Sequence, residues 1–141
     1  MNVYVIGKFE EKETVREVIS ELTRAGHIIT HNWTQDETSG LRGAERCEHL
    51  AWSAALDAEG VRKADAVLVL HHPQLCGGLV EFGMALADPK KLAVVVTAFG
   101  KDPVARHQPI FYWLPQVHHF QTVGAAVRFI SQTEKDRLKA V

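Results

Sequence analysis

The sequence has few cysteines and no sign of a metal-binding or membrane-spanning segment. Its two cysteines, Cys47 and Cys76, form neither a CxxC motif nor a disulfide framework. It contains no His-Glu-x-x-His motif, no Cys/His cluster with zinc spacing and no apolar run of about 18 residues. The first apolar segment, residues 2–7, is too short and carries too little charge to be a secretory signal. We therefore expect neither a metal nor another cofactor, no membrane partner, and a reducing cytoplasmic location.

The sequence also lacks an excess of either charge. Sixteen Lys and Arg residues face seventeen Asp and Glu residues, so the formal net charge is -1. Such a balance does not favour a nucleic acid polymer or an anionic membrane as partner. The 46% hydrophobic and 23% charged residues are typical of a folded globular protein. The length of 141 residues predicts a single domain spanning 1–141.

Short apolar runs alternate with amphipathic segments along the chain. The runs predict strands at 2–6, 27–31, 66–70, 92–98 and 117–120. The amphipathic segments predict helices at 12–25, 44–64, 79–87 and 123–137, with a mobile loop at 34–43 and irregular structure at 100–116. This alternation indicates an α/β fold whose five-stranded, mostly parallel sheet is covered by helices on both faces.

Parallel sheets bind ligands at the carboxyl ends of their strands, where the strand order reverses. With the order 2-1-3-4-5, that point lies between the first and third strands. A glycine pair at this place lets the backbone come close to a ligand, although it also suits a simple turn before a helix. The candidate binding residues are Gly7, Lys8, Phe9, His71, Gly77 and Gly78.

Asp57 stands where a charge is not expected. It lies inside the apolar stripe of the predicted helix 44–64, which consists of Leu50, Ala54, Val61 and Ala64. A carboxylate on a buried face needs a partner or a chemical role, because its desolvation is costly. Asp57 therefore either accepts a hydrogen bond from a nearby backbone or side-chain donor or belongs to a functional site.

Glu81 is the second unexpected carboxylate. It is the only charged residue between Ala66 and Ala87, and the pattern places it in the first turn of a buried helix. The dipole at a helix N-terminus favours the ionised form of such a glutamate. A purely structural role at the helix end is the alternative, but it does not explain why this charge is the sole one in the segment.

Two carboxylates in one crevice suggest divided roles. One stays ionised and attacks or stabilises a cation, whereas the other has a raised pKa and delivers a proton. Glycosidic bond cleavage through an oxocarbenium-like transition state uses this division. The sequence favours Glu81 as the nucleophile and Asp57 as the acid. Tyr4, near the carboxyl end of the first strand, is either a core residue or a third member of the site.

Three segments of the chain resemble the nucleoside 2-deoxyribosyltransferase superfamily, which includes deoxynucleoside-monophosphate N-glycosidases. They are 3–7 (VYVIG), 57–66 (DAEGVRKADA) and 77–86 (GGLVEFGMAL). The resemblance implies a flavodoxin-like three-layer sandwich and a nucleoside or nucleotide substrate. It also implies a homodimer or larger homo-oligomer in which a neighbouring subunit completes the site.

The same resemblance implies a role for each central residue. Glu81 corresponds to the nucleophile, Asp57 to the aspartate that assists the leaving base, and Tyr4 to the tyrosine that positions the nucleophile or the sugar. The Ser- and Arg/Gly-rich loop typical of the monophosphate hydrolases is absent after the first strand, and 74–76 (QLC) lacks the expected serine. The base, the acceptor and the need for a 5′-phosphate therefore stay open.

Two other functions remain compatible with the sequence. One is a non-catalytic nucleotide-binding or sensing module on the same fold. The other is a nucleoside-monophosphate phosphoribohydrolase of the lysine-decarboxylase-like type, which also places a glutamate after a glycine pair. The short chain and the absence of a Pro-Gly-Gly-x-Gly-Thr run argue against the second.

Overall fold

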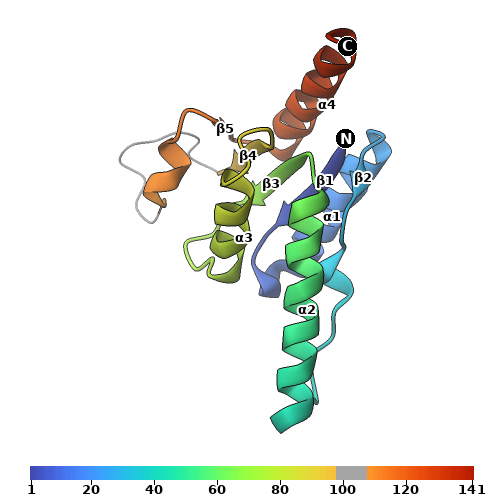
Figure 1. The fold of residues 1–141 in the computed structure, drawn as a ribbon, viewed down its shortest axis with the longest axis vertical. Helices are drawn as coiled ribbons and strands as arrows, with labels where there is room; N and C mark the ends of the chain where they lie inside the picture. The colour runs from blue at the N-terminus through green and yellow to red at the C-terminus, as the bar shows by residue number, and fades with distance from the viewer. Residues whose placement is uncertain (98–107) are drawn as a thin grey trace.

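Five parallel strands form the central layer, and helices cover both faces (Figure 1). The structure is a computed structural model and describes residues 1–97 and 108–141. The strands are β1 (Asn2–Ile6), β2 (Ile28–Ile29), β3 (Ala66–Leu70), β4 (Leu92–Val96) and β5 (Val117–Phe120). The helices are α1 (Lys12–Arg24), α2 (Gly43–Lys63), α3 (Gly77–Leu86) and α4 (Val123–Lys139). The sheet order β2-β1-β3-β4-β5 confirms the predicted flavodoxin-like α/β architecture.

The core lies between the sheet and its two helical layers. Strands β1, β3 and β4 are almost entirely buried because their apolar side chains meet helices on both faces. Helix α1 buries Val15, Val18 and Leu22 and keeps its charged residues outside. Within the helical layers, α1 contacts α4 and α2 contacts α3. The layer that holds α2 and α3 faces the viewer in Figure 1.

Strand β2 is shorter than the predicted segment 27–31. Only Asn2↔Ile28 and Val3↔Ile29 pair with β1. His27 lies before the strand with a buried side chain, and its Nε2 is 2.9 Å from the Ser131 hydroxyl of α4. The chain leaves the sheet after two pairs and forms a 3-10 turn at Trp33–Gln35. The predicted loop 34–43 thus begins with an ordered turn.

Helix α3 begins two residues earlier than predicted and is less buried. Its first residue is Gly77, so Glu81 lies in the second turn and the first turn contains no acidic residue. The helix buries Gly78, Phe82 and Ala85, but Val80 is 66% exposed. The prediction of a buried helix was therefore wrong for the outer face of α3.

The predicted irregular segment 100–116 is described only from residue 108 onward. Its described part contains a 3-10 helix at Ile110–Trp113, and residues up to 107 lie outside the described ranges. None of the helices in the described ranges is both apolar and long enough to span a lipid bilayer.

Candidate active site

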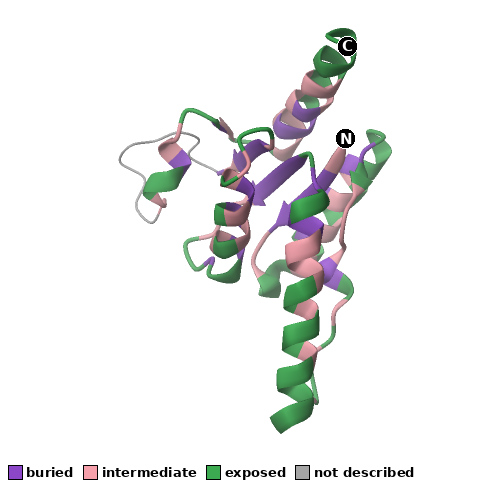
Figure 2. Ribbon diagram, viewed as in Figure 1, coloured by how far each residue is buried: buried purple, intermediate pink, exposed green. Residues whose placement is uncertain are grey.

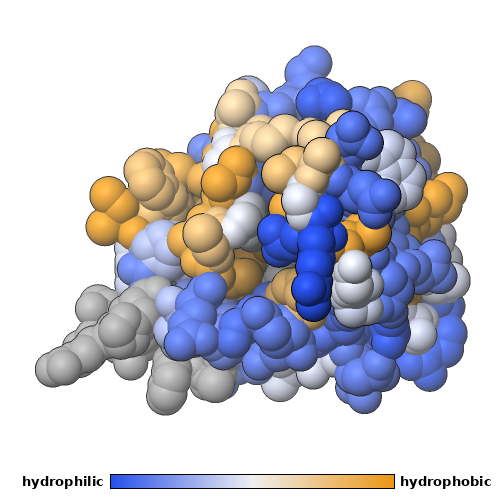
Figure 3. All heavy atoms as spheres, turned by 90° about the horizontal axis from the view of Figure 1, so that it is seen from below, coloured by the Kyte–Doolittle hydropathy of each residue, from blue (hydrophilic) through white to orange (hydrophobic). Residues whose placement is uncertain are grey.

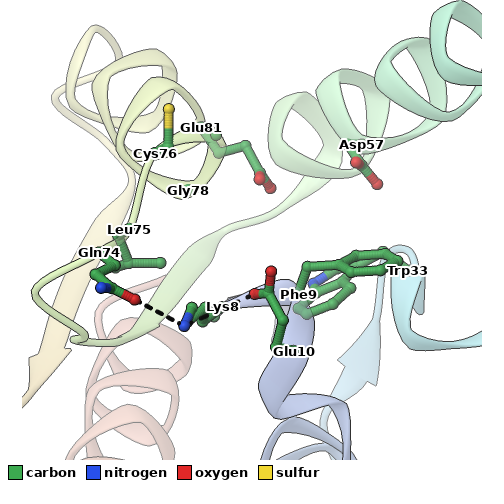
Figure 4. A pocket seen from close by; sticks show the side chains of 12 residues that line it. Lys8, Phe9, Glu10, Trp33, Asp57, Gln74, Leu75, Cys76, Gly78 and Glu81 are labelled. Carbon is green, nitrogen blue, oxygen red and sulfur yellow. Dashed lines mark hydrogen bonds and ion pairs between the residues drawn. The ribbon is translucent and has the colours of Figure 1, made fainter.

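A cavity of about 460 Å³ opens at the carboxyl ends of β1 and β3, where the strand order reverses (Figure 4). The segment after β1, the segment that leads from β3 into α3, and residues of α2 and α3 form its walls. Its lining residues are Gly7, Lys8, Phe9, Glu10, Trp33, Asp57, Gln74, Leu75, Cys76, Gly77, Gly78 and Glu81. Seven of the nine predicted site residues are among them; Tyr4 and His71 are not.

The two predicted carboxylates point into this cavity from neighbouring helices. Asp57 comes from α2 and Glu81 from α3, and the close-up view shows both carboxyl groups directed into the opening (Figure 4). Tyr4 lies within β1 and is fully buried. Its hydroxyl is near enough to both carboxyl groups for them to affect its pKa.

Three oxygens in this group have no hydrogen-bond partner among the described residues. They are Tyr4 Oη, Asp57 Oδ1 and Glu81 Oε2, and all three are shielded from solvent. Although Tyr4 Oη lies near both carboxyl groups, the contacts do not have hydrogen-bond geometry. Buried polar atoms normally have a hydrogen-bond partner, so three unpaired oxygens in one place indicate a site that can bind a polar ligand.

Burial raises the pKa of both carboxyl groups. Desolvation raises the pKa of Glu81 to about 7; Tyr4 has the next largest effect and lowers this pKa, and the nearby negative charge of Asp57 adds a smaller rise. Desolvation also raises the pKa of Asp57, whereas the neighbouring His31 and Tyr4 counteract the rise. Burial and the two carboxylates raise the pKa of Tyr4, which therefore stays a neutral phenol.

These shifts overturn the electrostatic reason given for the two roles. The sequence suggested that the helix end keeps Glu81 ionised and that burial protonates Asp57. Instead, Glu81 lies beyond the first turn of α3 and has the more strongly raised pKa of the two. Because the two buried carboxyl groups interact, they titrate as a pair, and a proton bound near neutral pH belongs to the pair rather than to one residue.

His31 contacts Asp57 from outside the cavity lining, and the sequence did not identify this neighbour. It follows β2, and its Nε2 lies 3.5 Å from Asp57 Oδ1, longer than a normal hydrogen bond but within ion-pair range. Its imidazole is the nearest basic group to Asp57 and lowers the pKa of that carboxyl. The sequence placed His31 as the last residue of the predicted strand 27–31, where nothing local distinguished it from an ordinary strand residue.

Two aromatic side chains form one wall of the cavity. Phe9 and Trp33 stack with ring centroids 6.3 Å apart and an interplanar angle of 21°. Trp33 is held in place by donating from Nε1 to the carbonyl oxygen of Val5 at 2.8 Å. Such a wall suits a flat aromatic ligand, which gains both apolar burial and stacking.

The opposite wall carries the only cationic side chain among the cavity-lining residues. Lys8 Nζ donates to Gln74 Oε1 at 3.0 Å and lies 4.0 Å from Glu10 Oε2. Glu10, Asp57 and Glu81 give the lining three carboxyl groups against this one ammonium group. Even with Glu81 protonated, the lining is not net positive.

The glycine pair at the start of α3 has two separate explanations. A Cβ on Gly78 would come within 2.8 Å of Ile6 Cγ2, so glycine is needed there for α3 to begin against the end of β1. A Cβ on Gly77 would meet nothing within 4 Å. No packing contact therefore requires a glycine at position 77, and its backbone there is open toward a ligand.

The structure does not bring His71 to the cavity. Its Nδ1 lies 3.0 Å from Tyr112 Oη, and the two rings meet edge to face. The imidazole thus lies beside the 3-10 helix Ile110–Trp113 rather than between the carboxylates. The histidine pair 71–72 is adjacent in sequence to the crevice, but the direction of each side chain was not predictable from that position.

Gly60 supports the site from behind, and its role can be tested by stability. A Cβ at this position would lie 2.9 Å from Tyr4 Cδ2 and Cε2 and 2.9 Å from His31 Cβ. We expect Gly60→Ala to lower the free energy of unfolding by about 1–3 kcal/mol, because overpacking outweighs the better helix propensity of alanine. Urea denaturation measures the change.

The matched control for this substitution is Gly124→Ala in α4. Its Cβ would meet only the flexible end of Arg128, at 3.4 Å, and a carboxyl oxygen of Glu21 at 3.7 Å. We expect this variant to be as stable as the wild type or more stable by about 0.5–1 kcal/mol. Equal stability of the Gly60 and Gly124 variants would contradict the close packing assigned to Gly60.

Among the residues in 1–97 and 108–141, no three His, Cys, Asp or Glu side chains come together as a candidate metal site. Comparison of the chain with protein families, curated proteins and solved structures found no match.

Proposed function

We propose that the protein cleaves the N-glycosidic bond of a 2′-deoxynucleoside or deoxynucleotide and transfers the deoxyribosyl group to a base or to water. The observation that carries the proposal is that Asp57 and Glu81 line one cavity, with the buried Tyr4 hydroxyl beside both and an unpaired buried oxygen on each of the three residues. The cavity volume of about 460 Å³ is within the range of small-molecule sites. The family resemblance of the sequence supplies the reaction.

In the proposed first step, a carboxylate oxygen of Glu81 forms a bond to C1′ while the bond from C1′ to the base nitrogen breaks. The departing base takes a proton from the Asp57 side of the site, either from Asp57 itself or from His31 beside it. In the second step, a water molecule or an acceptor base attacks C1′ and releases Glu81 as a carboxylate. The acceptor gives its proton back to the same group.

The proposed chemistry requires that Glu81 and Asp57 together hold one proton. Glu81 must be ionised to attack, so its proton has to move toward Asp57 before or during reaction. Because one proton is shared between two buried groups, the required microstate has the same total charge as the resting state. Tyr4 can donate a hydrogen bond to the attacking carboxylate or to the sugar oxygen.

The walls of the cavity suggest how such a substrate would lie. The stacked Phe9 and Trp33 would take the base on the side of Asp57, with the sugar next to Glu81. The 5′ end of the sugar would then point toward Lys8 and Gln74. This orientation supports the division of roles between the two carboxyl groups.

The charge of the cavity favours an uncharged nucleoside over a nucleotide. A 5′-phosphate would enter a site with three carboxyl groups, and the single lysine already contacts Gln74 and Glu10. We expect Glu10→Gln to raise the ratio of kcat/KM for a 5′-monophosphate to that for the nucleoside by about 2- to 5-fold, because it removes a nearby negative charge that is partly screened by solvent.

The control for this experiment is Glu17→Gln on α1, which removes the same charge from an exposed position outside the cavity lining. We expect no change in the ratio for this variant. A Glu10 variant whose ratio stays at the wild-type value, or a wild type that strongly prefers the monophosphate, would contradict the proposed preference.

The proposed reaction is tested by chromatography of released base. The protein is incubated with deoxynucleosides and their 5′-monophosphates, each with and without a free acceptor base. We expect release of the base, and a new nucleoside when the acceptor is present if the protein is a transferase. Nucleotide binding by calorimetry without any product would instead favour the sensing module.

We further propose that the protein acts in the cytoplasm as a homodimer or larger homo-oligomer, the assembly that the family resemblance implies. Both Cys47 and Cys76 are exposed free thiols, which suits a reducing compartment.

A further inference from the structure

The N-terminal half of α2 projects beyond the rest of the molecule (Figures 1 and 2). In this free half, residues 43–55, every residue is exposed except His49 and Ser53, which are of intermediate burial. The prediction that the apolar stripe of α2 is buried along its length is therefore wrong for Leu50 and Ala54. Isolated helices shorter than about 12–15 residues are marginal in water, so the free half needs contacts that hold it.

Apolar packing does not supply those contacts. The view from below, toward the free end of α2, shows hydrophilic and hydrophobic side chains mixed on this surface (Figure 3). A second cavity, of about 190 Å³, lies between α2 and residues 31–36. Trp52 and Leu56 line it from α2, and His31 and Asp36 line it from the other side. Because van der Waals contacts are lost across a cavity, polar contacts at its edges have to hold the helix.

One face of α2 makes a row of such polar contacts with residues 30–36. The contacted positions, 49, 53, 57 and 60, are three or four residues apart and therefore share one face of the helix. The contacts are Thr30 Oγ1 to the Gly60 carbonyl oxygen at 2.7 Å, His31 Nε2 to Asp57 Oδ1 at 3.5 Å, and Asp36 to Ser53 Oγ and His49 Nε2, both at 2.6 Å. Asp57 is the member of this row that lines the candidate active site.

Asp36 accepts the side-chain hydrogen bonds that the free half makes with the rest of the described chain. Ser53 Oγ donates to its Oδ2, and His49 Nε2 donates to its Oδ1. Although desolvation opposes the shift, the hydrogen bonds from Ser53 and His49 contribute to a lowered pKa of Asp36, so its carboxyl group is ionised at neutral pH. Both hydrogen bonds are therefore charge-assisted and stronger than those between neutral groups.

The backbone around Asp36 is fixed on the other side, to α1. Lys12 Nζ donates to the Asp36 carbonyl oxygen at 2.6 Å, and Arg16 Nη2 donates to the Thr34 carbonyl oxygen at 2.8 Å. Helix α1 is itself packed against the sheet. Asp36 thus connects the free half of α2 to a part of the fold that is well supported.

The side chain of Asp57 has little that fixes it directly. Asp57 Oδ1 has no hydrogen-bond partner among the described residues, and the contact with His31 is longer than a hydrogen bond. Its place in the cavity therefore depends on where the backbone of α2 carries it. Asp57 lies four residues after Ser53, about one turn further along the same face, so a displacement at Ser53 is transmitted to Asp57.

We infer that Asp36 is a positioning residue for Asp57: its carboxylate holds Ser53 and His49, and through them it sets the course of α2 and the place of Asp57 in the cavity. The inference rests on the proposed function for the role of Asp57 as proton donor. Its first test needs no substrate, so its failure is distinct from failure of the proposed chemistry.

Hydrogen–deuterium exchange of the full-length protein tests the contacts directly. We expect Asp36→Ala to speed amide exchange at least about 10-fold in peptides covering 46–58, because the loss of hydrogen bonds to a charged group favours local opening. Exchange in β1 and β3 should match the wild type. Glu37→Ala is the matched control, because it removes a neighbouring exposed carboxylate that makes no hydrogen bond or ion pair within the described ranges, and it should exchange like the wild type.

Displacement of Asp57 also has a kinetic signature that a general loss of stability lacks. We expect Asp36→Ala to lower kcat/KM at least about 10-fold for a natural deoxynucleoside, whose base needs a proton to leave. For a 2-deoxyribosyl substrate that releases 4-nitrophenolate, which leaves without a proton, we expect a loss of less than about 2-fold. Glu37→Ala should match the wild type on both substrates.

A second variant separates the position of Asp57 from the charge of Asp36. Burial and, to a smaller extent, the charge of Asp36 raise the pKa of Asp57, so Asp36→Ala changes both position and charge. The combined substitutions His49→Ala and Ser53→Ala remove the two donors and keep the carboxylate. We expect the same faster exchange and the same difference between substrates, and adding Asp36→Ala should change neither by more than about 2-fold.

Unchanged exchange around Asp57 in either folded variant would overturn the inference, and so would an equal effect on both substrates in an active protein. A wild type that releases no base would instead refute the proposed function. The exchange experiment would then still decide whether Asp36 holds the part of α2 that carries Asp57.

Discussion

Replacing Glu81 with glutamine should abolish base release and at the same time stabilise the free protein above pH 7. We expect the rate to fall by at least about 1,000-fold, because removal of the proposed nucleophile leaves only binding and electrostatic effects. Glutamine has nearly the same shape, so the fold and the cavity should persist. The gain in stability follows from the burial that raises the pKa of Glu81 to about 7.

The sign of the stability effect follows from proton linkage. The unfolded chain releases the proton of Glu81 near its ordinary pKa of 4.5, whereas the folded protein keeps it up to about pH 7. Between these values the folded state binds more protons, so the contribution of Glu81 to stability decreases as the pH rises and stays low above 7. Glutamine has no such dependence.

We therefore expect the effect of the substitution on the free energy of unfolding to differ between two pH values. Relative to the wild type, the free energy of unfolding of Glu81→Gln should increase by about 2–3 kcal/mol more at pH 8 than at pH 5. Urea denaturation of both proteins at each pH measures this difference and cancels any constant cost of burying an amide.

Glu59→Gln on α2 serves as the control of opposite sign. Hydrogen bonds from Arg62 and Lys63 lower the pKa of Glu59, so its contribution is lost as the pH falls rather than as it rises. If Glu81→Gln showed the same difference from the wild type at pH 5 and pH 8, the raised pKa of Glu81 would be refuted. Unchanged base release would independently refute its role as nucleophile.

The sequence predicted the centre of the fold better than its edges. Strands β1, β3 and β4 are continuous apolar runs, and only burial on both faces of a parallel sheet explains such runs. Strand β2 lies at the edge and begins only after His27, whose side chain turns toward Ser131 of α4. That contact joins residues 104 positions apart and leaves no local pattern in the sequence.

The two helices that carry the site show a second limit of sequence reasoning. The apolar pattern of α3 predicted a helix buried all round, but the structure buries only the face that carries Gly78, Phe82 and Ala85. Val80 is exposed in the single chain, and so is the N-terminal half of the α2 stripe. Periodicity reports which face of a helix is apolar and not what covers that face.

Candidate site residues were predictable where they broke a local rule. Asp57 and Glu81 are charges within apolar segments, and both line the cavity. His31 and Gly60 follow common patterns, and their roles arise only from the neighbours that the fold brings to them. The wrong first-turn position of Glu81 came from placing the start of α3 after the glycine pair instead of at Gly77.

Replacing Asp57 with asparagine should reduce release of a natural base by about 100- to 10,000-fold, the usual effect of removing a general acid. The loss should depend on the leaving group. A 2-deoxyribosyl substrate that departs as a stable anion, such as 4-nitrophenolate, needs no proton, so the variant should keep most of its rate on that substrate. Glu81→Gln should lose activity on both substrates.

The pH dependence separates the two roles further. For a natural base the wild-type kcat/KM should fall as the pH rises through about 7, because the carboxyl pair then loses its last proton. For the nitrophenyl substrate it should instead rise through about the same pH, because only ionised Glu81 is needed.

In Asp57→Asn the rise for the nitrophenyl substrate should move to lower pH, because the negative charge of Asp57 contributes to the raised pKa of Glu81. The pKa of Glu81 should fall only part of the way to its ordinary value, because burial is the larger cause of the raised pKa and burial remains in the variant.

Rates are measured by nitrophenolate absorbance for one substrate and by chromatography for the other. Glu59→Gln, on the same helix but outside the cavity lining, should match the wild type in both assays. If Asp57→Asn lost equal factors on both substrates, Asp57 would act on the sugar or the nucleophile and not as the proton donor.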